Sequence, residues 1–267
     1  MAADFLARLG SRASVPGEVR SAWGVEEYVA LAAPREGIEA ELAQIAHRRA
    51  RALRRVDAFR VRALLEALAD PPAAELNRAR VAAAAGIPVT TLPPYLDVLA
   101  ELGVVRLVPG CRSSVARRAI SRPRVVFDDP AVARHLAGVP VEDLRELRGR
   151  SRLAPLLEGV VAAELLRQQP HSSVEFRVSH LRERNGLEVD LVLELPDDTV
   201  YGVEVRTASS YRPHQFAGLQ ALAARAGSRF RGGIVLTTAP RGHHYRPGMW
   251  GLPISALWDW DQSGPPR

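Results

Sequence analysis

Two strand-like runs that meet at a short turn constrain this chain more than any other feature. Residues 187–195 (LEVDLVLEL) and 199–207 (TVYGVEVRT) alternate apolar and polar residues, and Pro196-Asp197-Asp198 separates them. Alternation with a period of two is typical of a β-strand, and a turn-forming triplet between two such runs predicts an antiparallel hairpin. If Asp197 is the centre of the turn, residues whose numbers sum to twice 197 face each other.

This register brings four charged residues together on one face of the hairpin. Asp190 lies opposite Glu204, and Glu188 lies opposite Arg206, while the valines and leucines between them form the other face. Two carboxylates that face each other repel. Such a pair persists where water screens it or where a divalent cation lies between the two groups. The alternative is a solvent-facing surface in which Glu188 and Arg206 form an ion pair worth about 0.5 kcal/mol.

If a divalent cation lies between the two carboxylates, the hairpin forms a magnesium site. Mg²⁺ prefers hard oxygen ligands, and a bound ion lowers the pKa of an attacking water. Asp190 and Glu204 would be two ligands, and the preceding helical stretch, residues 154–169, offers Glu158 or Glu164 as a third. These two are six residues apart, nearly opposite around a helix, so at most one of them points at the site.

The surrounding pattern predicts an α+β domain over residues 151–267. A helix over 154–169 precedes a strand over 173–180, and Asn185-Gly186 forms a second hairpin turn before residue 187. A helix over 213–227 and a strand over 232–238 follow the first hairpin. Further on, His243 and His244 lie in a stretch rich in Pro and Gly that predicts a surface loop.

The N-terminal part reads as a helical region over 1–70, followed by a winged helix-turn-helix and a connector over 71–150. A small-residue helix ends near Gly86, a second helix starts near Thr91, and the runs 104–108 and 124–129 supply the strands of a wing. Pro93 and Pro94 occupy the first turn of the second helix, where side chains that read base edges would normally lie. We therefore expect weak or sequence-independent DNA binding, with a protein-packing winged helix as the alternative.

The segment between the two wing strands is the part of the sequence that most favours nucleic-acid binding. The formal net charge is +6, all 36 basic residues are arginine, and the first 150 residues hold 23 Arg against 18 acidic residues. Phosphate contact needs positive charge without a fixed geometry. Residues 111–124 (CRSSVARRAISRPR) contain no acid, and we expect DNA contacts from their arginines, namely Arg112, Arg117, Arg118, Arg122 and Arg124.

Several motifs together resemble the C-terminal half of domain of unknown function 4143 proteins. They are RNGLEVDLVLEL, VYGVEVRTASS, FAGLQALAARAG, FRGGIVLTT and WGLPISALW, with upstream pieces from about residue 40 onwards. The resemblance implies a restriction-endonuclease-like fold with a nuclease-like site of the PD-(D/E)XK type. It assigns Asp190, Glu204 and Arg206 to the catalytic positions, and it favours Glu158 as the third magnesium ligand.

The chain departs from this family in two ways. Members usually carry an AAA+ ATPase domain, but the sequence lacks the G-x-x-x-x-G-K-[ST] loop, so we expect no ATP site, and any ATPase partner would be a separate chain. Arg206 also stands where an active nuclease has a lysine. Arginine stays protonated and forks across two oxygens, so it is a poor activator of water.

The sequence therefore favours a DNA-associated binding or regulatory protein with a degenerate nuclease-like domain. The alternatives are an active Mg²⁺-dependent DNA phosphodiesterase and a protein-binding module that acts with a separate ATPase subunit.

A single cysteine excludes an internal disulfide. The apolar runs are shorter than a membrane span, which favours a cytoplasmic protein with no membrane partner.

Overall fold

The computed structural model describes residues 5–12, 19–52, 58–116, 122–146, 150–184 and 186–258. The chain divides into two compact units. The first contains Met1–Tyr28, Val108–Ser121 and Val161–Arg267, and the second contains Val29–Leu107 and Arg122–Val160. The domains that the sequence predicts, with boundaries at residues 70 and 150, are each one continuous stretch of chain. In the structure the chain passes between the two units four times. The difference arises because each hydrophobic core collects side chains that are far apart in the sequence.

The second unit is helical, with one small sheet. Its helices are α3 (Ile38–Ala52), α4 (Ala58–Ala69), α5 (Arg78–Ala84), α6 (Leu92–Glu101), α7 (Pro130–Leu136) and α8 (Val141–Arg145), and its strands are β1 (Val105–Val108) and β2 (Arg124–Phe127). Asn77 caps α5 by accepting a hydrogen bond from the Arg80 N–H at 3.1 Å. The order α5, α6, β1, β2 agrees with the predicted helix-turn-helix and wing.

Three further helices belong wholly or partly to the first unit. They are α1 (Phe5–Arg12), α2 (Val25–Ala30) and α9 (Arg150–Gln168). The division between the units falls within α2 and within α9, and also before Val108, the last residue of β1. Among the described residues, no helix is both long enough and apolar enough to span a membrane.

The first unit is built on a six-stranded mixed sheet with the order β3-β4-β5-β6-β8-β7. The hairpin register is confirmed, because Leu191 pairs with Val203 and Leu193 pairs with Tyr201 across β4 and β5. The turn between these strands contains Asp198 with a φ of +61°, a conformation that aspartate tolerates better than most residues. The strands are β3 (Arg177–Arg182), β4 (Glu188–Glu194), β5 (Val200–Arg206), β6 (Phe230–Thr237), β7 (His243–Arg246) and β8 (Met249–Pro253).

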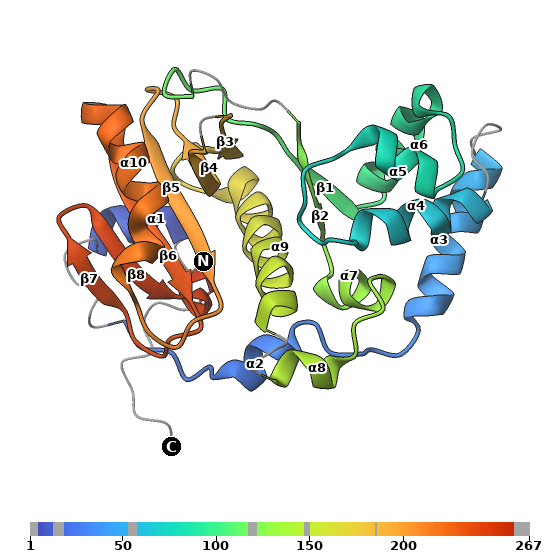
Figure 1. Cartoon of the computed structure of the whole chain (residues 1–267), viewed down its shortest axis with the longest axis horizontal. Coiled ribbons are helices and arrows are strands. Elements are labelled where there is room, and N and C mark those ends of the chain that lie inside the picture. The colour runs from blue at the N-terminus through green and yellow to red at the C-terminus, as the bar shows by residue number, and fades with distance from the viewer. Residues whose placement is uncertain are drawn as a thin grey trace. The chain divides into compact units, whose positions relative to one another are not determined.

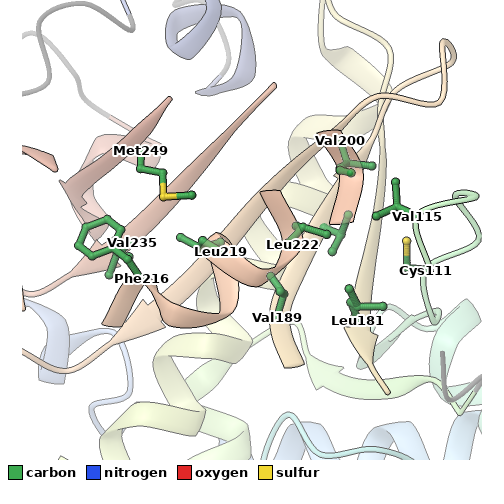
Figure 2. Close-up of a cluster of buried hydrophobic side chains, with 12 residues drawn as sticks. Cys111, Val115, Leu181, Val189, Val200, Phe216, Leu219, Leu222, Val235 and Met249 are labelled. Carbon is green, nitrogen blue, oxygen red and sulfur yellow. The ribbon is translucent and has the colours of Figure 1, made fainter. Parts of the chain in front are cut away.

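Helix α10 (Ala217–Ala226) connects β5 to the parallel strand β6 and covers one face of the sheet (Figure 1). Its side chains Leu219 and Leu222 point into the core that Figure 2 shows, together with Val189, Phe216 and Cys111. Gly202 on β5 allows this close approach, because a Cβ there would come within 2.7 Å of Leu219. Fully burying one such leucine contributes about 1.5–3 kcal/mol, so this interface anchors the hairpin.

The C-terminal strands differ from the prediction. His243 and His244 do not lie in a loop; they belong to β7, which pairs antiparallel with β8 at the edge of the sheet. Pairing with β8 supplies the hydrogen bonds that local sequence could not predict. The stretch that carries WGLPISALW forms β8 and the 3-10 turn Ile254–Leu257.

Candidate functional site

The structure brings Asp190, Glu204 and Arg206 together in the middle of the first unit. Asp190 lies on β4, and the other two lie near the end of β5. Both carboxylates are buried, with 6% of Asp190 and 2% of Glu204 exposed, whereas the Arg206 side chain keeps 37% of its surface exposed. The two carboxylates of the hairpin therefore do not face solvent, contrary to the solvent-exposed alternative.

A β-bulge places Asp190 in this arrangement. The register between β3 and β4 shifts by one residue, so Asp190 and Leu191 lie opposite His180 alone. A bulge bends its strand and redirects the side chains next to it. As a result Val189 and Val192 join the same core, although strict alternation would place them on opposite faces.

Asp190 accepts two hydrogen bonds from β5 and its arginine. The Val205 N–H donates to Asp190 Oδ2 at 2.9 Å, and Arg206 Nη1 donates to the same oxygen at 2.7 Å. The backbone of β5 therefore uses this side-chain carboxylate as an acceptor beyond Leu191 and Val203, where the paired residues of β4 and β5 end. Asp190 is in this way a structural residue as well as a candidate catalytic one.

Arg206 spans both carboxylates. Its Nη2 lies 2.5 Å from Glu204 Oε2, while its Nη1 also donates to the Val205 carbonyl at 2.7 Å. The predicted cross-strand pair between Glu188 and Arg206 is replaced by these contacts, and Glu188 instead lies 4.0 Å from Arg182. The physical reason is that the long guanidinium side chain reaches the two buried carboxylates, where an unpaired charge would cost more than at the exposed Glu188.

Glu204 is held in a confined position. Burial, followed by the charge of Asp190, raises the pKa of the Glu204 carboxyl well above its ordinary value, although Arg206 acts in the opposite direction. Its Oε1 lies against α10, where a Cβ added to Gly218 would collide with that oxygen. Gly218 is a site residue that the sequence did not reveal; its only signal is a glycine near the start of a helix.

Both candidates for the third carboxylate have partners of their own. Glu158 forms an ion pair with Arg124 at 3.5 Å in the second unit, and Glu164 accepts a hydrogen bond from Gln168 at 2.7 Å and pairs with Arg167. Across the described ranges, no three His, Cys, Asp or Glu side chains form a group that could hold a metal ion.

The pair by itself does not fit magnesium in this arrangement. Mg²⁺ demands a near-octahedral set of oxygens. One oxygen of each carboxylate, Asp190 Oδ2 and Glu204 Oε2, accepts from the Arg206 cation, and Oδ2 also accepts from a backbone N–H. The site therefore holds a guanidinium between its carboxylates rather than an open position for a divalent ion.

The predicted DNA-binding arginines have different surroundings. Arg112 and Arg122 are exposed, whereas Arg124 is buried, with 7% exposed, beside Glu158. Arg117 and Arg118 lie outside the described residues.

The start of the basic segment is attached to the sheet of the first unit. The Cys111 N–H donates to the His180 carbonyl at 2.7 Å, and the Ser113 N–H donates to Glu194 at 2.6 Å. Asp198 accepts from the Ser113 hydroxyl at 2.7 Å, which fixes the segment to the β4–β5 turn. The part of the wing up to residue 116 is thus a docked segment rather than a flexible one.

The second helix of the helix-turn-helix presents no long hydrogen-bonding side chain of the kind that reads bases. Its exposed positions include Pro93, Pro94, Asp97 and Glu101. Asp97 and Glu101 carry the same sign of charge as phosphate, so this helix face is unsuited to entering a DNA groove.

Two family models match parts of the chain, and both are described as domains of unknown function. Residues 154–257 match the family model described as Domain of unknown function (DUF4143), which confirms the resemblance that the C-terminal motifs indicated. Residues 28–143 match a different model, Domain of unknown function (DUF8612), rather than an extension of the first. Neither the comparison with curated proteins nor that with solved structures found a match.

Proposed function

We propose that the protein is a DNA-associated binding or regulatory protein whose nuclease-like site does not hydrolyse DNA. The observation that carries this proposal is the position of Arg206, which donates to Asp190 at 2.7 Å and to Glu204 at 2.5 Å. A nuclease of this type needs both carboxylates for its metal and a residue that can activate water. Here a cation that keeps its proton donates to both carboxyl groups, and burial raises the pKa of Glu204, which favours its neutral form.

The argument for DNA association is electrostatic. The chain carries a net charge of +6 through arginine alone, and guanidinium groups match phosphate geometry in a bidentate manner. The exposed face of α6 offers no base-reading side chain, which favours contact with phosphates over sequence readout. The expected binding is therefore independent of sequence and sensitive to salt.

Cleavage and binding are tested separately with the full chain. Labelled single-stranded and duplex oligonucleotides are incubated with Mg²⁺ or Mn²⁺ for cleavage, and binding is measured in a chelator. We expect binding that weakens as salt increases, without cleavage. Cleavage by the wild type that Asp190→Ala abolishes would overturn the inactive-site proposal, and failure to bind either DNA at low salt would overturn the DNA proposal.

Arg206→Lys provides the matched variant, because it restores the lysine of active nucleases and keeps the charge. Lysine cannot bridge two carboxylates with a planar fork, so the carboxylates become available to a metal. We expect Mg²⁺ to raise the thermal midpoint of Arg206→Lys more than that of the wild type. Equal and sizeable stabilisation of both proteins would show that Arg206 does not exclude the ion.

A further inference from the structure

The outer edge of the six-stranded sheet carries an aromatic cluster. β7 is the last strand in the order, as Figure 1 shows, and its residue His243 is exposed. The His243 ring stacks on Tyr211, with ring centroids 5.4 Å apart and an angle of 11° between the ring planes. Tyr245, two residues along the same strand, stacks on Phe216 at 4.1 Å. Because Tyr211 and Phe216 support the two rings from within the unit, His243 and Tyr245 are held in place rather than free to turn.

Arginines without acidic partners lie near these rings along the chain. Arg212, Arg241 and Arg246 are exposed, and Arg246 lies over the Tyr245 ring at 5.7 Å. Arg20 is also exposed and pairs with Arg241 in an isolated β-bridge. Within the described part of the chain, none of these four arginines forms an ion pair, whereas Arg177, Arg225, Arg229 and Arg231 in the same unit all do.

The segment that carries most of these residues contains no acid. From Val205 to Trp258 the chain contains seven arginines and no Asp or Glu. Two arginines in partner positions of a bridge repel each other, and an anion between them would relieve this repulsion. We call this surface the edge face and define it by Arg20, Tyr211, Arg212, Arg241, His243, Tyr245 and Arg246.

We infer that the edge face binds single-stranded DNA. The arginines contact the phosphates, and a base stacks on the His243 ring. Sites for single strands combine a cationic track with aromatic rings on which unpaired bases stack. A duplex keeps its bases paired, so it gains the phosphate contacts without the stacking. The inference rests on the proposed DNA association and specifies its surface, which lies on the nuclease-like domain and not on the helix-turn-helix.

The test compares two double variants that remove the same charge. Arg241→Ser/Arg246→Ser changes the edge face, and Arg78→Ser/Arg184→Ser removes two exposed arginines elsewhere. Binding of the full chain to a labelled oligo-dT and to a duplex of equal length is measured over a range of salt concentrations. For single strands each phosphate contact contributes about 0.7 to the slope of log K against log salt, so the edge variant should lower the slope by about 1.4. The control should keep the wild-type slope.

His243 separates stacking from charge. His243→Ala should weaken single-strand binding about tenfold at every salt concentration, whereas His243→Phe should retain the wild-type affinity because a ring remains. Thermal midpoints of all variants are compared with the wild type, and the control and His243→Phe keep the test valid if one variant is unstable.

The outcomes distinguish a failure of the edge-face inference from a failure of the proposed DNA association. Wild-type protein that binds neither DNA overturns the DNA association itself. Wild-type binding that both double variants reduce equally, or that prefers the duplex and ignores His243→Ala, overturns the edge-face inference and leaves the DNA association intact.

Discussion

Arg206 and Asp190 form an ion pair in which guanidinium Nη1 lies 2.7 Å from carboxylate Oδ2, on a carboxylate that also accepts the Val205 N–H. The pair connects a side chain that would serve catalysis in a nuclease to the backbone of the sheet. The same guanidinium also reaches Glu204, so one cation contacts two buried acids, and the raised pKa of Glu204 favours its neutral form. The region therefore holds a buried ion pair where a metal-dependent nuclease would need an open metal position.

Replacing Asp190 should reveal its structural role. Asp190→Ala leaves the buried Val205 N–H without its acceptor, and we expect a loss of about 1–3 kcal/mol in the free energy of unfolding. Asp190→Asn retains an acceptor oxygen and should lose less. Urea denaturation of the three proteins measures the difference, and equal stability of Asp190→Ala and wild type would contradict the role.

Gly218 should not tolerate a side chain. A Cβ at this position would meet the Glu204 carboxylate and lie 2.6 Å from the Glu188 carbonyl, so Gly218→Ala should destabilise the protein by about 1–3 kcal/mol through overpacking. Gly159→Ala is the control, because nothing lies within 4 Å of a Cβ there and alanine favours the helix by about 1 kcal/mol. Similar effects from both substitutions would show that Glu204 moves away without cost.

The α10 interface should carry a large share of the stability of the first unit. Leu219 is fully buried, and Leu219→Ala should cost about 2–5 kcal/mol because it leaves a cavity. Leu107 is 38% exposed, so Leu107→Ala should cost less than about 1.5 kcal/mol. Chemical denaturation compares the two, and an equal loss would mean that the interface is loosely packed.

The single cysteine should be unreactive in the folded protein. Burial and the nearby charge of Glu194 raise the pKa of the Cys111 thiol from 9.0 to about 12, and only the thiolate reacts. At pH 8 the reactive fraction falls about a thousandfold relative to an ordinary thiol, since each pKa unit is a factor of ten. Labelling by iodoacetamide should therefore be slow until denaturant unfolds the first unit. Rapid labelling without denaturant would place Cys111 outside the core.

Several elements follow from local sequence because their causes are local. The alternation of residues 187–195 and 199–207 around Pro196-Asp197-Asp198 predicts the observed register of β4 and β5. A turn and a period of two are properties of neighbouring residues, so no tertiary information is required. The same holds for α5, whose cap Asn77 and following glycine turn are visible in the sequence.

Other features depend on partners that are distant in the chain. Local sequence does not predict β7, because this short, polar segment gains a strand conformation only by pairing with β8. Arg124 lies in a segment that reads as a basic DNA contact, yet the structure buries it against Glu158. In both cases the deciding interaction lies outside the window in which a sequence pattern is recognised.

The sequence by itself determined the hairpin, the proximity of Asp190, Glu204 and Arg206, and the absence of lysine from the chain. Only the tertiary structure decided what Arg206 does. The bulge opposite His180 and the close packing of α10 at Gly218 bury the two carboxylates and turn them toward the arginine. Burial makes an uncompensated charge costly, so the guanidinium pairs with both acids, and that choice depends on surroundings that no linear spacing records.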